Sequence, residues 1–162
     1  MHPVSDESQV TVVIVDDEEM VLTSLESFLT LETEYAVHTF LSPTQALQFV
    51  GDNDVNLIIS DYLMPEMDGI SFLGAVRDIK PDVTRIILTG YADKENAIKA
   101  INEVGLFQYV EKPWDNDNLQ IVIRNGIERQ QLLASLRSRV EEINSAYADL
   151  QKIQADILKT FA

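Results

Sequence analysis

The stretch VNLIISDYLMPEMDG, residues 55–69, decides the fold of this chain. Its first part is a short apolar run with β-branched residues, which predicts a buried strand. A strand this apolar is typical of a parallel sheet that is covered on both faces. Reactive groups in such sheets lie just beyond the carboxyl ends of the strands, and Asp61 lies at that end. Pro65 and Asp68-Gly69 then predict a tight loop before the next helix.

An aspartate after a strand also serves as a helix N-cap or a turn former. Taken alone, Asp61 favours that structural interpretation. Its functional interpretation therefore depends on what the rest of the chain places at the same edge of the sheet.

Strands and helices are predicted to alternate five times along the chain. The other predicted strands are residues 10–15, 35–40, 84–89 and 107–110, and the second of these is expected near an edge of the sheet. Helical patterns follow each strand, and the last one runs from residue 115 towards the end of the sequence. This alternation predicts an α/β fold, with a parallel sheet, helices on both faces and right-handed crossovers.

Composition excludes several functional classes. The net charge of −15 argues against nucleic-acid binding, because phosphates would be repelled. The first 114 residues carry 20 acidic and 6 basic side chains, so this charge is concentrated there. The chain has no cysteine and no apolar run near the roughly 20 residues that span a bilayer. Residues 1–9 are polar, lack a signal-peptide pattern and are expected to be flexible, and these absences fit a cytoplasmic protein.

Polar residues follow four of the predicted strands. They are the pair Asp16-Asp17, Asp61, Thr89 and Lys112. Capping a helix dipole would explain one or two acids near Asp16, but four consecutive acids at residues 16–19 repel one another. Because the carboxyl ends of parallel strands share one edge, these distant residues are expected to converge on one small site.

The chain resembles the receiver domain of response regulators, the phosphorylated half of two-component signalling. The resemblance covers about residues 10–125 and implies a flavodoxin-like, doubly wound (βα)5 fold. Its motifs occur in order at strand ends: Asp16-Asp17, Asp61 with its Met64-Pro65 and Asp68-Gly69 loop, Thr89-Gly90, Tyr109, and Lys112-Pro113. In receivers the peptide bond between the lysine and the proline is usually cis, which would aim Lys112 into the site.

Three carboxylates close together cannot all remain ionised without a cation, because like charges raise a pKa. Mg²⁺ would resolve this, since it prefers oxygen ligands and usually keeps several waters. The resemblance implies Asp17 and Asp61 as direct ligands, with Asp16 acting mainly through water. The backbone carbonyl of Leu63 would complete the protein ligands.

The resemblance also implies the roles of the other site residues. Asp61 would take a phosphoryl group from a sensor histidine kinase or a phosphotransfer protein, as a phosphoacceptor rather than an enzyme. The ammonium of Lys112 and the hydroxyl of Thr89 would each bind a phosphoryl oxygen. Tyr109 would turn from exposed to buried when Thr89 moves. The structural alternatives stay open: Thr89 ending a strand, Lys112 on the surface and Tyr109 as an ordinary strand aromatic.

The lifetime of the phosphorylated state depends on two further positions. Leu63 and Tyr91 flank the site in receivers, and neither supplies an amide or a carboxylate that could orient an attacking water. The aspartyl phosphate is therefore expected to last longer than in receivers that have polar residues there.

The last part of the chain has a heptad pattern. Residues 126–162 are expected to form a helical coiled-coil linker that joins two copies of the chain in parallel. An output domain is expected beyond residue 162, and Gly126 is a candidate for a bend in the helix. The seam has Leu133, Val140, Tyr147, Gln154 and Phe161 at a positions, and Leu136, Ile143, Leu150 and Ile157 at d positions.

Two other classes of function share parts of this pattern. A Mg²⁺-dependent aspartyl phosphohydrolase of the haloacid dehalogenase type needs two aspartates separated by one residue, whereas Asp16 and Asp17 are adjacent. A constitutive dimerisation module with a vestigial pocket would keep the heptads and lose the phosphoacceptor chemistry.

Overall fold

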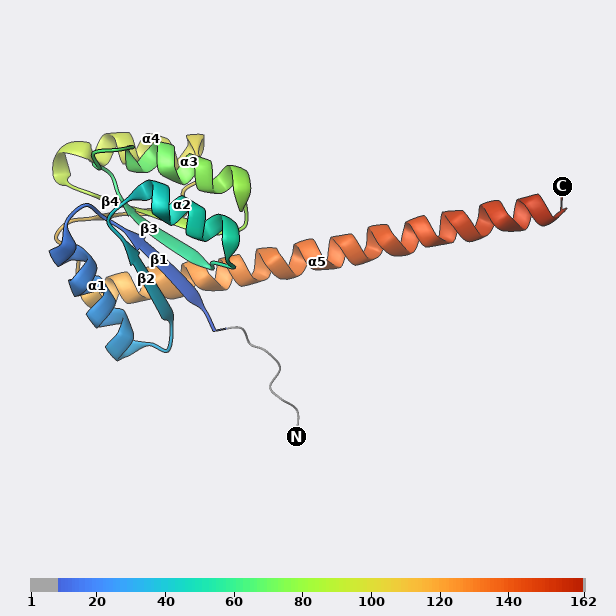
Figure 1. Cartoon of the computed structure of the whole chain (residues 1–162), viewed down its shortest axis with the longest axis horizontal. Helices are drawn as coiled ribbons and strands as arrows, with labels where there is room; N and C mark the ends of the chain where they lie inside the picture. Colours follow the sequence, from blue (N-terminus) through green and yellow to red (C-terminus); the bar gives the residue numbers. More distant parts are fainter. Residues whose placement is uncertain (1–8, 162) are drawn as a thin grey trace. The chain divides into compact units, whose positions relative to one another are not determined.

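Five parallel strands form one sheet in the order β2-β1-β3-β4-β5 (Figure 1). The structure is a computed structural model that describes residues 9–161, and of Tyr91 it describes the backbone alone. The expected α/β fold with a parallel sheet is confirmed, and β2 lies at an edge as expected. The strands are β1 (Thr11–Val15), β2 (Ala36–Phe40), β3 (Leu57–Asp61), β4 (Thr84–Thr89) and β5 (Gln108–Glu111).

A helix follows each strand, and side-chain caps start three of them. Before the last helix, Asp115 Oδ1 accepts hydrogen bonds from the amides of Asp117 and Asn118. Ser42 accepts a hydrogen bond from the amide of Gln45, and Asp68 accepts one from the amide of Ser71, as N-caps do. A short 3₁₀ turn, Tyr91–Asp93, precedes the fourth helix. The helices are α1 (Glu19–Glu32), α2 (Pro43–Asp52), α3 (Gly69–Ile79), α4 (Lys94–Glu103) and α5 (Asn116–Phe161).

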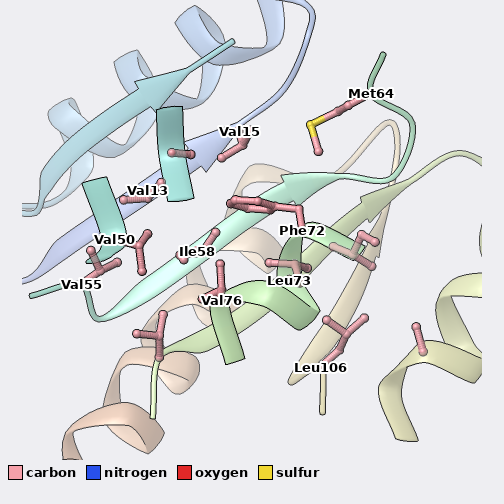
Figure 2. Packing of buried hydrophobic residues seen from close by; sticks show 14 of the residues in the cluster. Val13, Val15, Val50, Val55, Ile58, Met64, Phe72, Leu73, Val76 and Leu106 are labelled. Atoms are coloured by element: carbon pink, nitrogen blue, oxygen red, sulfur yellow. The ribbon is translucent and has the colours of Figure 1, made fainter. Parts of the chain in front are cut away.

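The sheet separates two apolar clusters because successive side chains of a strand point to opposite faces. Val13 and Val15 of β1 join the cluster beneath α2, α3 and α4, together with Phe72 and Leu73 (Figure 2). Val12 and Ile14 join the cluster beneath α1 and the first part of α5. Figure 1 shows α2, α3 and α4 on one side of the sheet and α1 on the other. The core therefore fixes the strands firmly on both faces.

The strand register brings the carboxyl ends together. Val15 pairs with Ser60, and Asp61 pairs with Leu88. Thr89 pairs with Glu111. The residues that follow β1 and β5, and the last residues of β3 and β4, therefore lie along one edge of the sheet.

Helix α5 continues through Gly126, and the space around this glycine is narrow. A Cβ atom at this position would lie 2.8 Å from Leu57 Cδ1 and 2.9 Å from Thr84 Cγ2. Gly126 therefore allows the helix to approach the sheet closely.

The structure divides into two compact units, the first ending at Gln130 and the second beginning at Gln131. The second unit is helical through Phe161, and most of its described side chains are exposed. Seven exposed apolar residues of this unit belong to the heptad seam: Leu136, Val140, Ile143, Tyr147, Leu150, Ile157 and Phe161. Within residues 9–161, no helix combines the length and apolarity that crossing a membrane requires.

Candidate functional site

Asp61 is the last residue of β3, and its carboxylate is held from two directions. Only 8% of the residue is exposed. Its Oδ1 accepts a hydrogen bond from the amide of Tyr62 at 3.0 Å and one from Lys112 Nζ at 3.0 Å. The strand therefore presents one oriented, nearly buried carboxylate at the edge of the sheet.

The loop after Asp61 closes tightly onto the strand. The amide of Gly69 donates to the carbonyl of Tyr62 at 2.8 Å. A Cβ atom at residue 69 would lie 2.1 Å from the carbonyl oxygen of Asp61, so no side chain fits at this position. The predicted tight turn is confirmed, and it returns the chain to the start of α3 directly beside Asp61.

Glu66 fastens the same loop to the start of α2. Its Oε2 accepts hydrogen bonds from Ser42 Oγ at 3.0 Å and from Thr44 Oγ1 at 2.9 Å. A carboxylate is also favoured at a helix N-terminus, where the amide dipoles converge. Glu66 could not be identified from the sequence, because its partners lie more than 20 residues away along the chain.

Asp16 follows β1, and its side chain is fully buried. Its Oδ1 accepts the amide of Glu18 at 2.8 Å, and its Oδ2 accepts Lys112 Nζ at 3.2 Å. Asp17 and Glu18 are exposed, and one carboxylate oxygen of each lies within 4.8 Å of the others and of Asp16. Glu18 thus adds a third acid to the predicted pair, and the run of four acids was the signal for it.

Lys112 lies between Asp16 and Asp61. Its backbone amide donates to the carbonyl of Thr89, and the peptide bond to Pro113 is cis, as the receiver resemblance implies. Its ammonium makes ion pairs with both acids. Residues 16, 61 and 112 are therefore brought together, as expected, and the alternative of Lys112 as a plain surface lysine is wrong.

Burial governs the electrostatics of this cluster. It raises the pKa of Asp61, and the negative charge of Asp17 adds to that shift, against the opposing effect of Lys112. Burial also raises the pKa of Asp16, against the hydrogen bond from Glu18. Burial disfavours the Lys112 ammonium, but its hydrogen bond and its attraction to the acids outweigh this, so its pKa is raised. The two carboxyls thus hold protons more tightly than ordinary acids do.

The donor set fits a hard divalent cation. Asp16, Asp17 and Asp61 supply carboxylate oxygens from two adjacent strand ends, and the single ammonium of Lys112 balances only part of their charge. Mg²⁺ binds such all-oxygen sites with water completing its shell. Leu63 lies two residues after Asp61 in the loop that Glu66 fastens, with 61% of the residue exposed.

Thr89 is the last residue of β4, and Tyr109 lies two residues before the end of β5, beside Ile87 of β4. Thr89 is fully buried, and its hydroxyl donates to the carbonyl of Gly90 at 3.1 Å. Tyr109 is half-buried against the cluster beneath α4, and Lys94 Nζ lies 5.9 Å from the centre of its ring. Lys94 also pairs with Glu111 at 3.6 Å. The side chain of Tyr91 lies outside the described residues.

The fold and this cluster define a class of protein. The response regulator receiver domain family matches residues 12–124, and the chain belongs to that family. Receiver domains are phosphoacceptors of two-component signalling rather than catalytic enzymes. They typically bind Mg²⁺, and a response regulator implies a cognate histidine kinase.

Individual proteins agree with this assignment. The hydrogenase transcriptional regulatory protein HoxA of Cupriavidus necator is 37% identical over 126 residues, covering 78% of this chain and 26% of that protein. The transcriptional regulatory protein FixJ of Rhizobium meliloti is 33% identical, covering 88% of this chain and 68% of that protein. The signal receiver domain of an HD domain-containing protein from Pseudomonas fluorescens is 36% identical. The two structures superpose with a TM-score of 0.71 over 76% of this chain and 98% of that one.

The chain covers only part of its longer relatives. It spans about a quarter of HoxA, which extends well beyond the matched part. The similarity therefore identifies the receiver domain, and any output activity of a longer protein is a matter for proposal.

Proposed function

We propose that Asp61 accepts a phosphoryl group from a phosphohistidine on a sensor histidine kinase or a phosphotransfer protein. A carboxylate oxygen of Asp61 attacks the phosphorus, a P–O bond forms, and the P–N bond to the histidine breaks, leaving an acyl phosphate. The observation that carries this proposal is the position of Lys112. Its ammonium lies 3.0 Å from Asp61 Oδ1, so it can also bind an oxygen of the phosphoryl group that is added there. The reaction needs positioning and charge neutralisation more than a protein acid or base.

The acidic cluster would hold the Mg²⁺ that this reaction requires. Asp17 and Asp61 would bind it directly, Asp16 mainly through water, and Leu63 through its backbone carbonyl. The ion would neutralise charge on the transferred group when bound. Burial raises the pKa of Asp16 and Asp61, and a nearby cation would oppose that shift by favouring their ionised forms.

Thr89 and Tyr109 would form the switch. On phosphorylation the Thr89 hydroxyl would leave the carbonyl of Gly90 and donate to a phosphoryl oxygen. The half-buried ring of Tyr109 would then turn inward and reshape the surface of α4 and β5. Lys94 of α4 lies over this ring, so a movement of Tyr109 would change the surroundings of a charged residue on that helix.

The change would be transmitted through a parallel homodimer of the last helix. We propose a receiver domain over residues 10–125 and a helical linker over residues 126–162, in a cytoplasmic regulator. The first turn of that linker packs on the receiver, and the coiled coil would begin after it. Seven of the nine seam residues are apolar and exposed in the single chain. Among the described residues of the second unit, the acids lie at the b and c positions of the heptad, away from the seam: Glu141, Glu142, Asp149 and Asp156. A second copy can therefore approach the seam without acidic repulsion.

The phosphorylated state is expected to persist. The side chain of Leu63 is apolar and exposed, so it cannot orient a water for attack on the acyl phosphate. Loss of the phosphoryl group within seconds, in the absence of a phosphatase, would contradict this expectation.

The test is treatment with acetyl phosphate and Mg²⁺, followed by mass spectrometry and a measurement of oligomeric state. The wild-type chain should gain one phosphoryl group and change its dimerisation, and Asp61→Asn should do neither. Asp54→Asn, at an exposed position before β3, is the matched control and should behave as wild type. Equal dimerisation of wild type and Asp61→Asn, with no phosphoryl group gained, would favour a constitutive dimerisation module instead.

A further inference from the structure

The edge of the sheet opposite Asp61 holds α5 by a close and specific contact. Thr84, the first residue of β4, is fully buried, and its Oγ1 donates to the carbonyl of Gly126 at 2.6 Å. A helix-interior carbonyl rarely needs such a donor, because it already accepts a bond within its own helix. This contact therefore serves the attachment of the helix to the sheet.

Because Gly126 has no side chain, the attachment is specific for one position of α5 along its own axis. A Cβ atom there would lie within 3 Å of both Leu57 and Thr84. Sliding α5 by one residue moves it about 1.5 Å and turns it by about 100°, which would bring Asn125 or Ile127 to this place. Neither side chain fits, so the contact accepts α5 in one axial position.

Asn56 adds a second attachment one turn further along α5. Its backbone amide donates to the carbonyl of Thr11 at 3.0 Å, and its carbonyl accepts the amide of Thr84 at 3.1 Å. Its side chain accepts the amide of Thr11 at 2.9 Å and donates to Gln130 Oε1 at 2.7 Å. One residue therefore joins β1, β4 and α5 at the amino ends of the strands.

The strands that hold α5 at one end hold the phosphoacceptor site at the other. β3 runs from Leu57, against Gly126, to Asp61, and β4 runs from Thr84 to Thr89. The two strands pair in fixed register from Leu57 with Thr84 to Asp61 with Leu88. Every residue of both strands is buried, so closely packed elements could carry a displacement from one end to the other.

We propose that Asn56 and Thr84 are positioning residues that lock α5 to the sheet in one axial setting and couple it to the phosphoacceptor site. The proposal rests on the proposed function for its second half, because coupling requires phosphorylation at Asp61. The lock itself stands on the contacts of Thr84, Gly126, Asn56 and Gln130.

The test compares Thr84→Val and Gln130→Ala with wild type, and uses Thr23→Val, an exposed threonine of α1, as the control. Thr84→Val keeps the shape of the side chain and removes the donor to Gly126. Gln130→Ala removes the bond to Asn56 from the helix side and leaves the buried strands intact. Hydrogen exchange of amides 119–130 should accelerate at least tenfold in each variant and stay unchanged in the control.

A second measurement addresses coupling. Both variants should gain a phosphoryl group from acetyl phosphate within twofold of the wild-type rate, and should lose the change in dimerisation that phosphorylation causes. Wild-type exchange at residues 119–130 would overturn the lock. Accelerated exchange with wild-type coupling would overturn the transmission. Failure of wild type to be phosphorylated would refute the proposed function instead, and hydrogen exchange would still decide the lock.

Discussion

Lys112 shows how one side chain organises the site at the scale of single residues. Its ammonium bridges Asp16 and Asp61, which lie at the ends of adjacent strands. Two buried carboxylates this close would repel one another without it. The site therefore has more negative than positive charge. For this reason we expect the stability of the folded chain to depend on pH and on added metal.

Replacing Asp61 by asparagine should stabilise the fold near neutral pH when Mg²⁺ is absent. The pKa of Asp61 is raised in the folded chain, so between the ordinary value of 3.8 and the raised value the folded state binds more protons. The stability of wild type therefore falls as pH rises through this window, and the variant escapes that loss. Urea unfolding in EDTA should show the variant as more stable at about pH 7, with a gap that closes as the acid is protonated below its ordinary pKa.

Magnesium should reverse that order, because an ion that binds only the folded wild type stabilises it by mass action. The exposed Asp54→Asn is the control and should follow wild type in both conditions. A variant less stable than wild type at neutral pH without metal would contradict the prediction.

Gly69 tolerates no side chain, and the cost of adding one should be large. Gly69→Ala would place a methyl group 2.1 Å from the carbonyl oxygen of Asp61. We expect a loss of about 3 kcal/mol in the free energy of unfolding. Gly74→Ala in the same helix meets only Val104 at 3.7 Å and should change stability by less than about 1 kcal/mol. Equal denaturation midpoints for the two variants would contradict this account.

Glu66 matters at the scale of elements, because it joins the loop after β3 to the start of α2. Glu66→Ala should lower stability by about 1 kcal/mol and weaken Mg²⁺ binding a few-fold, since the loop that carries Leu63 loses its fastening. A double-mutant cycle with Thr44→Val should give a coupling energy of about 0.5–1 kcal/mol. Additive effects of the two changes would show that their hydrogen bond contributes nothing.

The sequence predicted the elements and the edge at which their polar residues meet. Asp16, Asp61 and Lys112 could be found because each follows a recognisable strand, and parallel strands share one edge. The hydrogen-bond partners of Glu66 and the close contact of Gly126 with β3 and β4 could not be found in this way. They depend on contacts between helices and strands distant in the chain, and hydrophobic periodicity fixes a face of a helix but not its axial position.

At the scale of the whole molecule, the exposed seam of the second unit governs association. Leu150→Glu would put a charge at a d position in both chains, and dimerisation should weaken by at least about 100-fold. Ser145→Glu, at the f position of the same helix, should leave dimerisation unchanged. Analytical ultracentrifugation at several concentrations measures both. Dimers of undiminished affinity in Leu150→Glu would show that the seam is not the interface.

The attachment of Gly126 and Gln130 to the sheet has a practical consequence for building chimeras. A graft that joins this receiver to a foreign effector at residue 125 would remove Gly126 and Gln130, the two residues through which α5 contacts Thr84 and Asn56. The incoming helix would bring a bulkier residue against Leu57 and Thr84. A junction placed after Gln130 keeps both native contacts with the sheet, and the imported sequence begins at the next turn of the helix.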